Sequence, residues 1–368
     1  MLNRKLRVGI IGCGIIAPFH IEALLRLPDV QIRGLADAVE SKVISLTNQY
    51  DIDFYTTDYH QILKEDVDII DICSPSGLHC QMALDAITAD KHVMVEKPLA
   101  VNLRQADEMI ELSKKAGVKL AVIFDHRFDH LSIKVKQALS EGKFGKLILC
   151  DAYVKWYRTE EYYRGTWRGN WDMDGGGVLA NQAIHWVDLL QWVIGPVKRV
   201  FGKIKTVTHD IEGADLAVAV LEFRNGTLGV IEASTSIYPG TKGRGIVYLN
   251  LPEQFGIYGE KGSVEIEESK RVKLWEFEDG VQTSETIDPE IKGKVPVTSH
   301  YEELKQIVNA IREDGNVPVD GEEARKSLEV IRAIYYSSFT GKQVELPFSH
   351  DQDAELDQLI ERSIRHES

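Results

Sequence analysis

The sequence predicts an α/β protein of two domains: a parallel sheet covered by helices in residues 1–124, and an α+β domain with a large, mostly antiparallel open sheet in residues 125–368. Two observations carry this prediction. Apolar runs of strand length alternate with helical segments up to Phe124, as in parallel sheets covered on both faces. Beyond Phe124 several β-rich runs follow one another, separated by turn residues such as Asn225-Gly226 that suit hairpins. A chain of 368 residues that is 43% hydrophobic can bury both cores.

The first strand and the turn after it organise the N-terminal domain. Residues 6–11 form an apolar run, and the turn from Gly12 to Ala17 has the pattern G-x-G-x-x-A. In this pattern the first Gly permits a sharp bend, the second lets backbone approach a pyrophosphate, and the small last residue lets the helix pack closely on the strand. Glycines also gather in ordinary strand-to-helix turns, but the whole combination predicts a Rossmann dinucleotide-binding domain.

Asp37 discriminates between the two nicotinamide dinucleotides. It stands twenty residues beyond Ala17, at the end of the next predicted strand, residues 32–36. A carboxylate there accepts hydrogen bonds from a ribose 2′-hydroxyl and repels a 2′-phosphate. Ala38 and Val39 offer no cation for a phosphate, so the sequence favours NAD over NADP.

The rest of the first domain continues the alternation. Strands are expected near Phe54 and over residues 67–73, 92–95 and 119–124, and helices over 40–50, 82–87 and 103–116. Ligands of open α/β sheets bind at the carboxyl ends of the strands. The residues that follow four of these strands are therefore expected to line one site: Gly12, Asp37, Ser74 and Lys97.

The second domain is expected to hold most of its strands in one sheet. Strands are predicted over residues 146–157, 200–207, 215–223, 227–236, 246–251, 255–258, 263–267 and 272–275, and helices over 127–142, 301–313, 322–338 and the tail from Asp351. An antiparallel sheet with one face free of helices needs a cover, which predicts a homo-oligomer.

Lys97 is the first candidate catalytic residue. It stands in Glu96-Lys97-Pro98, at a strand end beside the expected nicotinamide position. When a secondary alcohol loses a hydride its O–H proton must leave too, and a lysine there can take it. A surface lysine before a loop-forming proline is the alternative. His79, which follows the Ser74-Pro75 turn, is either a cofactor contact or a packing residue.

His185 is the second candidate. Three glycines at 175–177 precede a helix on which Asn181, His185 and Asp188 share one face by their spacing. Glycines there allow close approach of a ligand. His185 would be the acid/base partner, Asn181 a substrate hydrogen bonder, and Asp188 the group that orients His185. A structural histidine is the alternative, and a metal site is disfavoured because the face has no second His or Cys.

Residues 153–171 interleave tryptophans and tyrosines with arginines and a lysine. A sugar nucleotide needs such stacking surfaces, together with cations for phosphate and carboxylate. Single-stranded nucleic acid could use the same chemistry, but a net charge of -14 argues against nucleic acid and against an anionic membrane surface. No apolar signal or membrane segment is seen and the four cysteines lack zinc-ligand spacing, so we expect a cytoplasmic protein without a metal.

These motifs together resemble the Gfo/Idh/MocA family of oxidoreductases over essentially the whole chain. The resemblance rests on residues 9–17, Ser74-Pro75 with His79, Glu96-Lys97-Pro98, the 175–177 glycines with His185, and the patterns at 300–301 and 335–338. Residues 75–79, 156–158, 161–163, 167–169 and 181–185 are similar to the branch that oxidises UDP-2-acetamido-2-deoxyglucuronate at C3. This resemblance implies a tightly held NAD, recycled in some members by 2-oxoglutarate, a 3-keto product passed to an aminotransferase, and tetramers joined through the second-domain sheets.

The function predicted from residues and resemblance is NAD-dependent oxidation of a sugar nucleotide at its C3 hydroxyl. Lys97 and His185 are the expected catalytic residues. The expected cofactor-binding residues are Gly12, Gly14, Ile15, Ile16, Asp37, Ser74, Pro75, His79, Glu96, Lys97, Trp167 and Arg168. The expected substrate-binding residues are Lys97, Arg127, Tyr157, Arg158, Arg164, Arg168, Asn181 and His185. The alternatives are another sugar or polyol dehydrogenase of inositol type, an NAD-dependent glycosidase, and a non-catalytic NAD-binding regulator.

Overall fold

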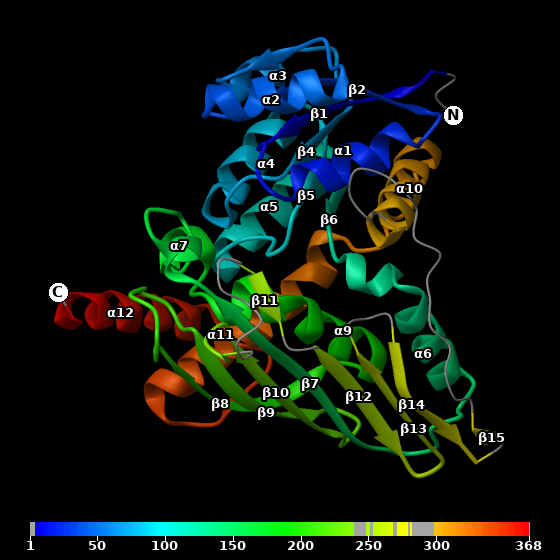
Figure 1. Cartoon of the computed structure of the whole chain (residues 1–368), viewed down its shortest axis with the longest axis vertical. Helices are drawn as coiled ribbons and strands as arrows, with labels where there is room; N and C mark the ends of the chain where they lie inside the picture. Colours follow the sequence, from blue (N-terminus) through cyan, green and yellow to red (C-terminus); the bar gives the residue numbers. More distant parts are fainter. Residues whose placement is uncertain are drawn as a thin grey trace. The chain divides into compact units, whose positions relative to one another are not determined.

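The computed structural model of the chain describes residues 4–238, 248–250, 253–267, 271–278, 280–281 and 298–367 (Figure 1). They form two compact units. The first comprises most of the first 128 residues and a later segment that ends at Arg325, and the second holds most of the remainder. None of the described helices is long and apolar enough to span a membrane.

The first unit is built on a six-stranded parallel sheet of order β3-β2-β1-β4-β5-β6. The strands are β1 (Leu6–Ile11), β2 (Val30–Ala36), β3 (Tyr55–Thr56), β4 (Ile69–Ile72), β5 (His92–Val95) and β6 (Leu120–Val122). The helices are α1 (Ala17–Leu25), α2 (Glu40–Tyr50), α3 (Tyr59–Ile62), α4 (His79–Thr88), α5 (Leu103–Ala116) and α10 (Thr298–Glu313). The strand order reverses between β1 and β4, so a ligand crevice is expected at their carboxyl ends.

Helix α10 differs from the predicted division of the chain at residue 124. The sequence predicts that residues 301–313 belong to the second domain, whereas Leu304, Ile307 and Val308 are buried in the core that also contains Ile21 and Leu24 of α1. The apolar stripe of α10 covers the parallel sheet because that sheet needs helices on both faces. The first unit is therefore completed by a segment from late in the sequence.

The second unit contains a ten-stranded sheet in which β10 pairs with β7 in parallel and the other neighbours are antiparallel. Its order is β15-β14-β13-β12-β7-β10-β9-β8-β16, and β11 also pairs with β7. The strands are β7 (Leu147–Arg158), β8 (Val197–Lys205), β9 (Leu216–Phe223), β10 (Leu228–Ser234), β11 (Tyr248–Asn250), β12 (Gln254–Gly259), β13 (Gly262–Glu267), β14 (Arg271–Phe277), β15 (Gly280–Val281) and β16 (Val344–Glu345). The predicted fold class is confirmed. Part of the strand predicted over 246–251 lies outside the described residues.

The helices of the second unit are mostly short, except those that end the chain. They are α6 (His130–Ser140), α7 (Glu160–Tyr163), α8 (Trp171–Asp174), α9 (Ile184–Ile194), α11 (Gly321–Thr340, which begins in the first unit) and α12 (His350–Glu367). A π-helical turn over Leu179–Ala183 precedes α9.

One face of the second sheet carries exposed apolar side chains. On β8, β9 and β10 the side chains of Phe201, Val218, Val220 and Leu228 are 45–50% exposed. They alternate with buried residues such as Ala219 and Leu221, as expected of a strand with one buried face.

Candidate active site

The Gly-rich turn has the geometry that a bound pyrophosphate needs. Gly12 has φ +101°, and a Cβ placed there would lie 2.6 Å from the Cys73 carbonyl carbon, so only glycine fits. At Gly14 a Cβ would meet no heavy atom within 4 Å, so open space borders this backbone. Among the described residues no side chain caps the N-terminus of α1, and Phe19 and His20 donate their N–H groups to the Ile16 carbonyl, so the N–H groups of the turn before the helix are the candidates for a phosphate. Ile15, which is 60% exposed, and Ile16 lie in the same turn.

Asp37 is held beside this turn by backbone hydrogen bonds. Its Oδ2 accepts the N–H of Cys13 at 2.7 Å, and its Oδ1 accepts the N–H of Val39 at 2.8 Å. The carboxylate is thus fixed at the end of β2, next to the glycines, where a ribose hydroxyl of a bound dinucleotide would need it. These residues therefore fit NAD.

His79 joins two of the predicted site segments. The ring is 1% exposed, with Nδ1 2.8 Å from the carbonyl oxygen of Pro98 and Nε2 2.9 Å from that of Ser74. Burial lowers the pKa of His79. The Ser74-Pro75 turn after β4 is therefore tied to the turn after β5. The predicted contact of His79 with the cofactor stays a prediction.

Glu96 and Lys97 follow β5 in a polar cluster that the sequence analysis did not find. Oε2 of Glu96 accepts the N–H of Lys97 at 3.1 Å, and Oε1 lies 2.9 Å from Nε2 of His20. Nδ1 of His20 lies 2.9 and 3.1 Å from the carboxylate oxygens of Asp71. Burial disfavours the protonated form of the His20 ring, but the negative charge of Asp71 and its hydrogen bond favour that form and raise the pKa of His20 well above its usual value. Burial likewise opposes ionisation of Glu96, but the hydrogen bond from His20 lowers its pKa.

Two further buried groups from α10 face this cluster. The ring centroid of His300 lies 5.6 Å from that of His20, and burial lowers the pKa of His300. Burial raises the pKa of Glu303 well above its usual value, and its Oε1 accepts the N–H of Phe124 at 2.8 Å. Burial therefore disfavours the charged form of both side chains.

The predicted substrate-binding Arg127 also belongs to the first unit. Its guanidinium is 6% exposed and lies 3.2 Å from Oε1 of Glu323. The structure thus shows a buried guanidinium paired with a half-buried carboxylate, and a role for Arg127 in substrate binding stays a prediction.

The aromatic and basic segment of the second unit stacks its cations on rings. The guanidinium carbon of Arg158 lies 4.5 Å from the ring centroid of Trp156, and that of Arg168 lies 4.6 Å from Tyr162 and 4.9 Å from Trp167. Stacking fixes the plane of a guanidinium. Arg158 is 4% exposed, and its Nη1 donates to the Tyr157 carbonyl at 3.0 Å. Tyr157 packs edge-on against Tyr238 at 5.7 Å.

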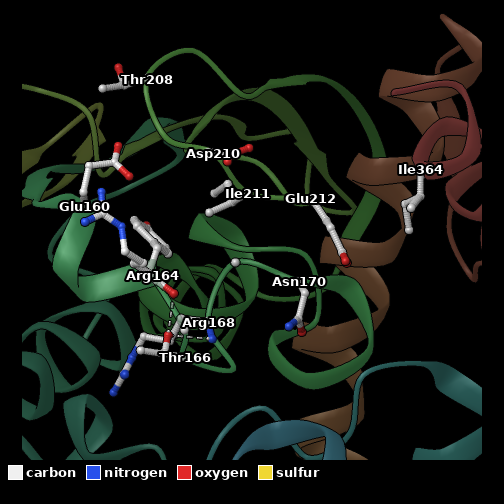
Figure 2. Close-up of a pocket in the computed structure, with 13 residues that line it drawn as sticks. Glu160, Arg164, Thr166, Arg168, Asn170, Thr208, Asp210, Ile211, Glu212 and Ile364 are labelled. Carbon is white, nitrogen blue, oxygen red and sulfur yellow. Dashed lines mark hydrogen bonds between the residues drawn. The ribbon is translucent and has the colours of Figure 1, made fainter. Parts of the chain in front are cut away.

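A polar hollow of about 760 Å³ opens beside this segment. Figure 2 shows Glu160 and Arg164 on one side of it and Asn170, Glu212 and Ile364 on the other. Its lining includes two guanidiniums and three carboxylates. The lining residues are Glu160, Tyr163, Arg164, Gly165, Thr166, Arg168, Gly169, Asn170, Thr208, Asp210, Ile211, Glu212 and Ile364. Such a lining suits a ligand that carries both anionic groups and hydroxyls.

The glycines at 175–177 serve internal packing. A Cβ at Gly176 would lie 2.2 Å from the Trp171 ring, and one at Gly177 would lie 2.3 Å from the Ala214 carbonyl oxygen. All three glycines have positive φ, between +79° and +99°. The expectation that they admit a ligand is therefore corrected for these two: the protein itself occupies the space next to Gly176 and Gly177.

A π-helical turn, Leu179–Ala183, lies within the segment for which the spacing predicted a shared face. Asn181 lies within it and donates from Nδ2 to Oδ1 of Asp174. Asp188 is buried, and its Oδ1 accepts a hydrogen bond from Oγ of Ser327 at 3.1 Å. Such turns recur at functional sites, since they re-aim side chains. His185 follows the turn in α9, and its catalytic role stays a prediction.

Comparisons with known proteins identify both units. The model of an oxidoreductase family with an NAD-binding Rossmann fold matches residues 6–124, and that of the GFO/IDH/MocA C-terminal domain matches residues 132–265. The crystal structure of the WlbA dehydrogenase from Bordetella pertussis, in complex with NADH and UDP-GlcNAcA, is 30% identical with a TM-score of 0.83, over 95% of this chain and 100% of that one. Myo-inositol 2-dehydrogenase from Thermotoga maritima is 27% identical over 91% of this chain and 100% of its own, and D-glucoside 3-dehydrogenase from Escherichia coli is 25% identical over 94% and 99%.

Proposed function

Since this chain belongs to the Gfo/Idh/MocA family and is an NAD-dependent dehydrogenase of sugars or polyols, we propose that its substrate is a sugar nucleotide, oxidised at the C3 hydroxyl. The substrate we assign is UDP-2-acetamido-2-deoxyglucuronate, and the product is its 3-keto form. The observation that carries this choice is the segment 156–168, which stacks two guanidiniums on aromatic rings and borders the polar hollow. The relative crystallised with UDP-GlcNAcA supports it.

The charges in the hollow match such a molecule. Arg164 and Arg168 supply cations for a pyrophosphate or a uronate carboxylate, because guanidiniums bind oxyanions with paired N–H groups. Glu160, Asp210 and Glu212 supply acceptors for sugar or ribose hydroxyls. We extend the same role in substrate binding to Tyr157, Arg158, Asn181 and Arg127.

Lys97 is the proton acceptor in this proposal. NAD, when bound, accepts the hydride that leaves C3, so the C–H bond breaks and the carbon becomes a carbonyl. The hydroxyl proton passes to the amine of Lys97, with His185 as the second acid/base group. The products are the ketone, the reduced cofactor and one proton on the protein. The turn at Gly12 and Gly14, with Asp37, binds the dinucleotide.

The exposed apolar face of the second sheet fits a subunit interface. Phe201, Val218, Val220 and Leu228 lie on neighbouring strands, where a second copy could cover them. We propose a homo-oligomer built on this face, and 2-oxoglutarate as the oxidant that recycles the reduced cofactor.

Mass spectrometry tests the proposed reaction. The purified protein is incubated with NAD, 2-oxoglutarate and UDP-2-acetamido-2-deoxyglucuronate. Loss of two hydrogens from the sugar nucleotide, with formation of 2-hydroxyglutarate, is the expected result. Arg168→Gln should raise KM for the sugar nucleotide by about tenfold or more, since a charge-assisted hydrogen bond is lost. Arg104→Gln, an exposed arginine of α5, is the matched control.

The second candidate, a polyol dehydrogenase of inositol type, is favoured by the relative from Thermotoga maritima. Reduction of NAD by myo-inositol, with no change in the sugar nucleotide, would select it. Arg168→Gln would then leave KM for the polyol unchanged, because an uncharged polyol has no oxyanion for this guanidinium.

A further inference from the structure

His20 links the core of the first unit to the strand end that carries Lys97. It lies on α1 with 0% of its side chain exposed, and Asp71 is also 0% exposed. Glu96, the other partner, is 6% exposed. Because these side chains are buried, each carboxylate needs protein donors for its hydrogen bonds.

Each nitrogen of the His20 ring faces a carboxylate, so the ring needs a proton on both nitrogens to donate a hydrogen bond to each. A neutral imidazole has one N–H and would turn a lone pair toward one of its two carboxylates, at 2.9 Å. A ring protonated on both nitrogens donates to Asp71 from Nδ1 and to Glu96 from Nε2, which are charge-assisted bonds. The other titratable groups that face it are Cys73 on β4 and His300 with Glu303 on α10. Burial disfavours the charged form of all three.

Glu96 passes this constraint to the backbone of Lys97. Its Oε1 is fixed by His20 and its Oε2 accepts the Lys97 N–H at 3.1 Å. The residue after Lys97 is held as well, since the Pro98 carbonyl lies 2.8 Å from Nδ1 of His79. The peptide unit before Lys97 and the carbonyl group of Pro98 are therefore both in contact with buried side chains.

We propose that His20 is a positioning residue for Lys97: it clamps the Glu96 carboxylate against the Lys97 N–H and so sets the direction in which the Lys97 amine is presented. The inference rests on the proposed function only for the role of that amine as proton acceptor. If the Lys97 amine is displaced by about 1 Å, the rate of substrate oxidation falls steeply, because proton and hydride transfer need aligned reacting atoms.

Two variants at one position separate the arms of the clamp. In His20→Asn the amide nitrogen lies close to the former Nδ1, so the bond to Asp71 is kept and Glu96 loses its donor. In His20→Gln the amide nitrogen reaches toward the former Nε2, so the bond to Glu96 is kept. Both remove the ring and its charge. His92→Gln is the control. His92 begins β5, the strand that Glu96 follows, and its Nδ1 accepts the Lys119 N–H at 3.0 Å.

The expected result is a lower kcat for His20→Asn than for His20→Gln. His20→Asn should lower kcat for substrate oxidation by about tenfold or more, while KM and the Kd of NAD change by less than about twofold. His20→Gln should stay within about threefold of the unmodified enzyme, because the Glu96 arm remains. Equal losses in both variants, or none in either, would overturn the proposal, because a purely structural histidine would not order them this way.

A measurement without turnover separates this proposal from the proposed function. Reductive methylation of the Lys97 amine, followed by peptide mass spectrometry across pH, reports its reactivity. His20→Asn should shift the midpoint of the labelling curve, while His20→Gln and His92→Gln should not. Were no sugar or polyol oxidised, the proposed function would fail and this comparison would still decide the role of His20.

Nitrogen NMR of the unmodified protein covers the case in which the variants do not fold. Both ring nitrogens of His20 should carry protons from about pH 6 to about pH 8, where an ordinary histidine loses one. A ring that deprotonates within that range would refute the clamp.

Discussion

Alanine at the two glycines of the nucleotide turn should have opposite consequences. Gly12 has φ +101°, and an added Cβ would lie 2.6 Å from the carbonyl of Cys73 and 2.7 Å from the backbone nitrogen of Ser74. Neither neighbour is a side chain that can move aside. Left-handed strain costs about 1–3 kcal/mol and overpacking about as much again, so Gly12→Ala should destabilise the protein by roughly 2–6 kcal/mol, with or without NAD.

Gly14 lacks both penalties. Its φ is not positive and its Cβ would meet nothing within 4 Å, so Gly14→Ala should leave the cofactor-free protein as stable as before, or more stable by about 0.5 kcal/mol. The new methyl group would occupy the space that a pyrophosphate needs. Loss of one or two charge-assisted N–H bonds, at about 1.5–3 kcal/mol each, predicts a Kd for NAD at least tenfold higher.

Thermal unfolding of the cofactor-free protein and titration with NAD test the pair together. The expected pattern is a lower melting temperature for Gly12→Ala, and an unchanged melting temperature with weakened binding for Gly14→Ala. If Gly14→Ala bound NAD as tightly as the unmodified protein, the pyrophosphate could not lie against this turn. If it melted as early as Gly12→Ala, the open space next to Gly14 would not exist.

Three further predictions follow from single positions. Asp37→Ala should raise the Kd of NAD by about tenfold or more and lower that of NADP, because the 2′-hydroxyl loses its acceptors and the 2′-phosphate loses a repelling charge; titration with both dinucleotides checks it. Phe201→Glu should lower the mass measured by light scattering, whereas Leu25→Glu, at an apolar residue exposed on α1, should not. Burial opposes ionisation of Asp68, but hydrogen bonds from Arg4 and a backbone N–H lower its pKa to about 2. Its stabilisation of about 2 kcal/mol should be present above about pH 4 and lost as the pH falls to about 2, so urea unfolding should find Asp68→Asn less stable at pH 7 and equally stable at the acid end.

The parallel sheet was predictable because its signals are local. Strand β5 and helix α5 have the bounds that their apolar runs and stop residues indicated, His92–Val95 and Leu103–Ala116. The position of α10 was not predictable in this way. Its apolar stripe is visible in the sequence, but the core that receives the stripe is built from residues almost 300 positions earlier. Hydrophobic periodicity shows that a face is buried without showing against what.

Site residues were predictable where one residue type is needed for one geometry. Gly12 is such a case, since its positive φ and its contact with Cys73 exclude every side chain. A side chain is excluded at Gly176 and Gly177 as well, but there the space beside the backbone is filled by Trp171 and Ala214 of the protein itself. A glycine motif therefore specifies close approach, and only the structure tells whether a ligand or the protein approaches.

The cluster around His20 shows which sequence signal was available and unused. Asp71 is an acid inside the buried strand Ile69–Ile72, and a buried carboxylate is tolerated only when donors neutralise it. The buried Asp71 therefore predicts a cation or several hydrogen-bond donors near the end of β4, but the sequence does not show which residues supply them. His20 fills that need from the helix after the nucleotide turn, and the same ring reaches Glu96 on the neighbouring strand. A charged residue in the middle of an apolar strand is in this way a sign of a polar network, and here that network ends at the backbone of Lys97.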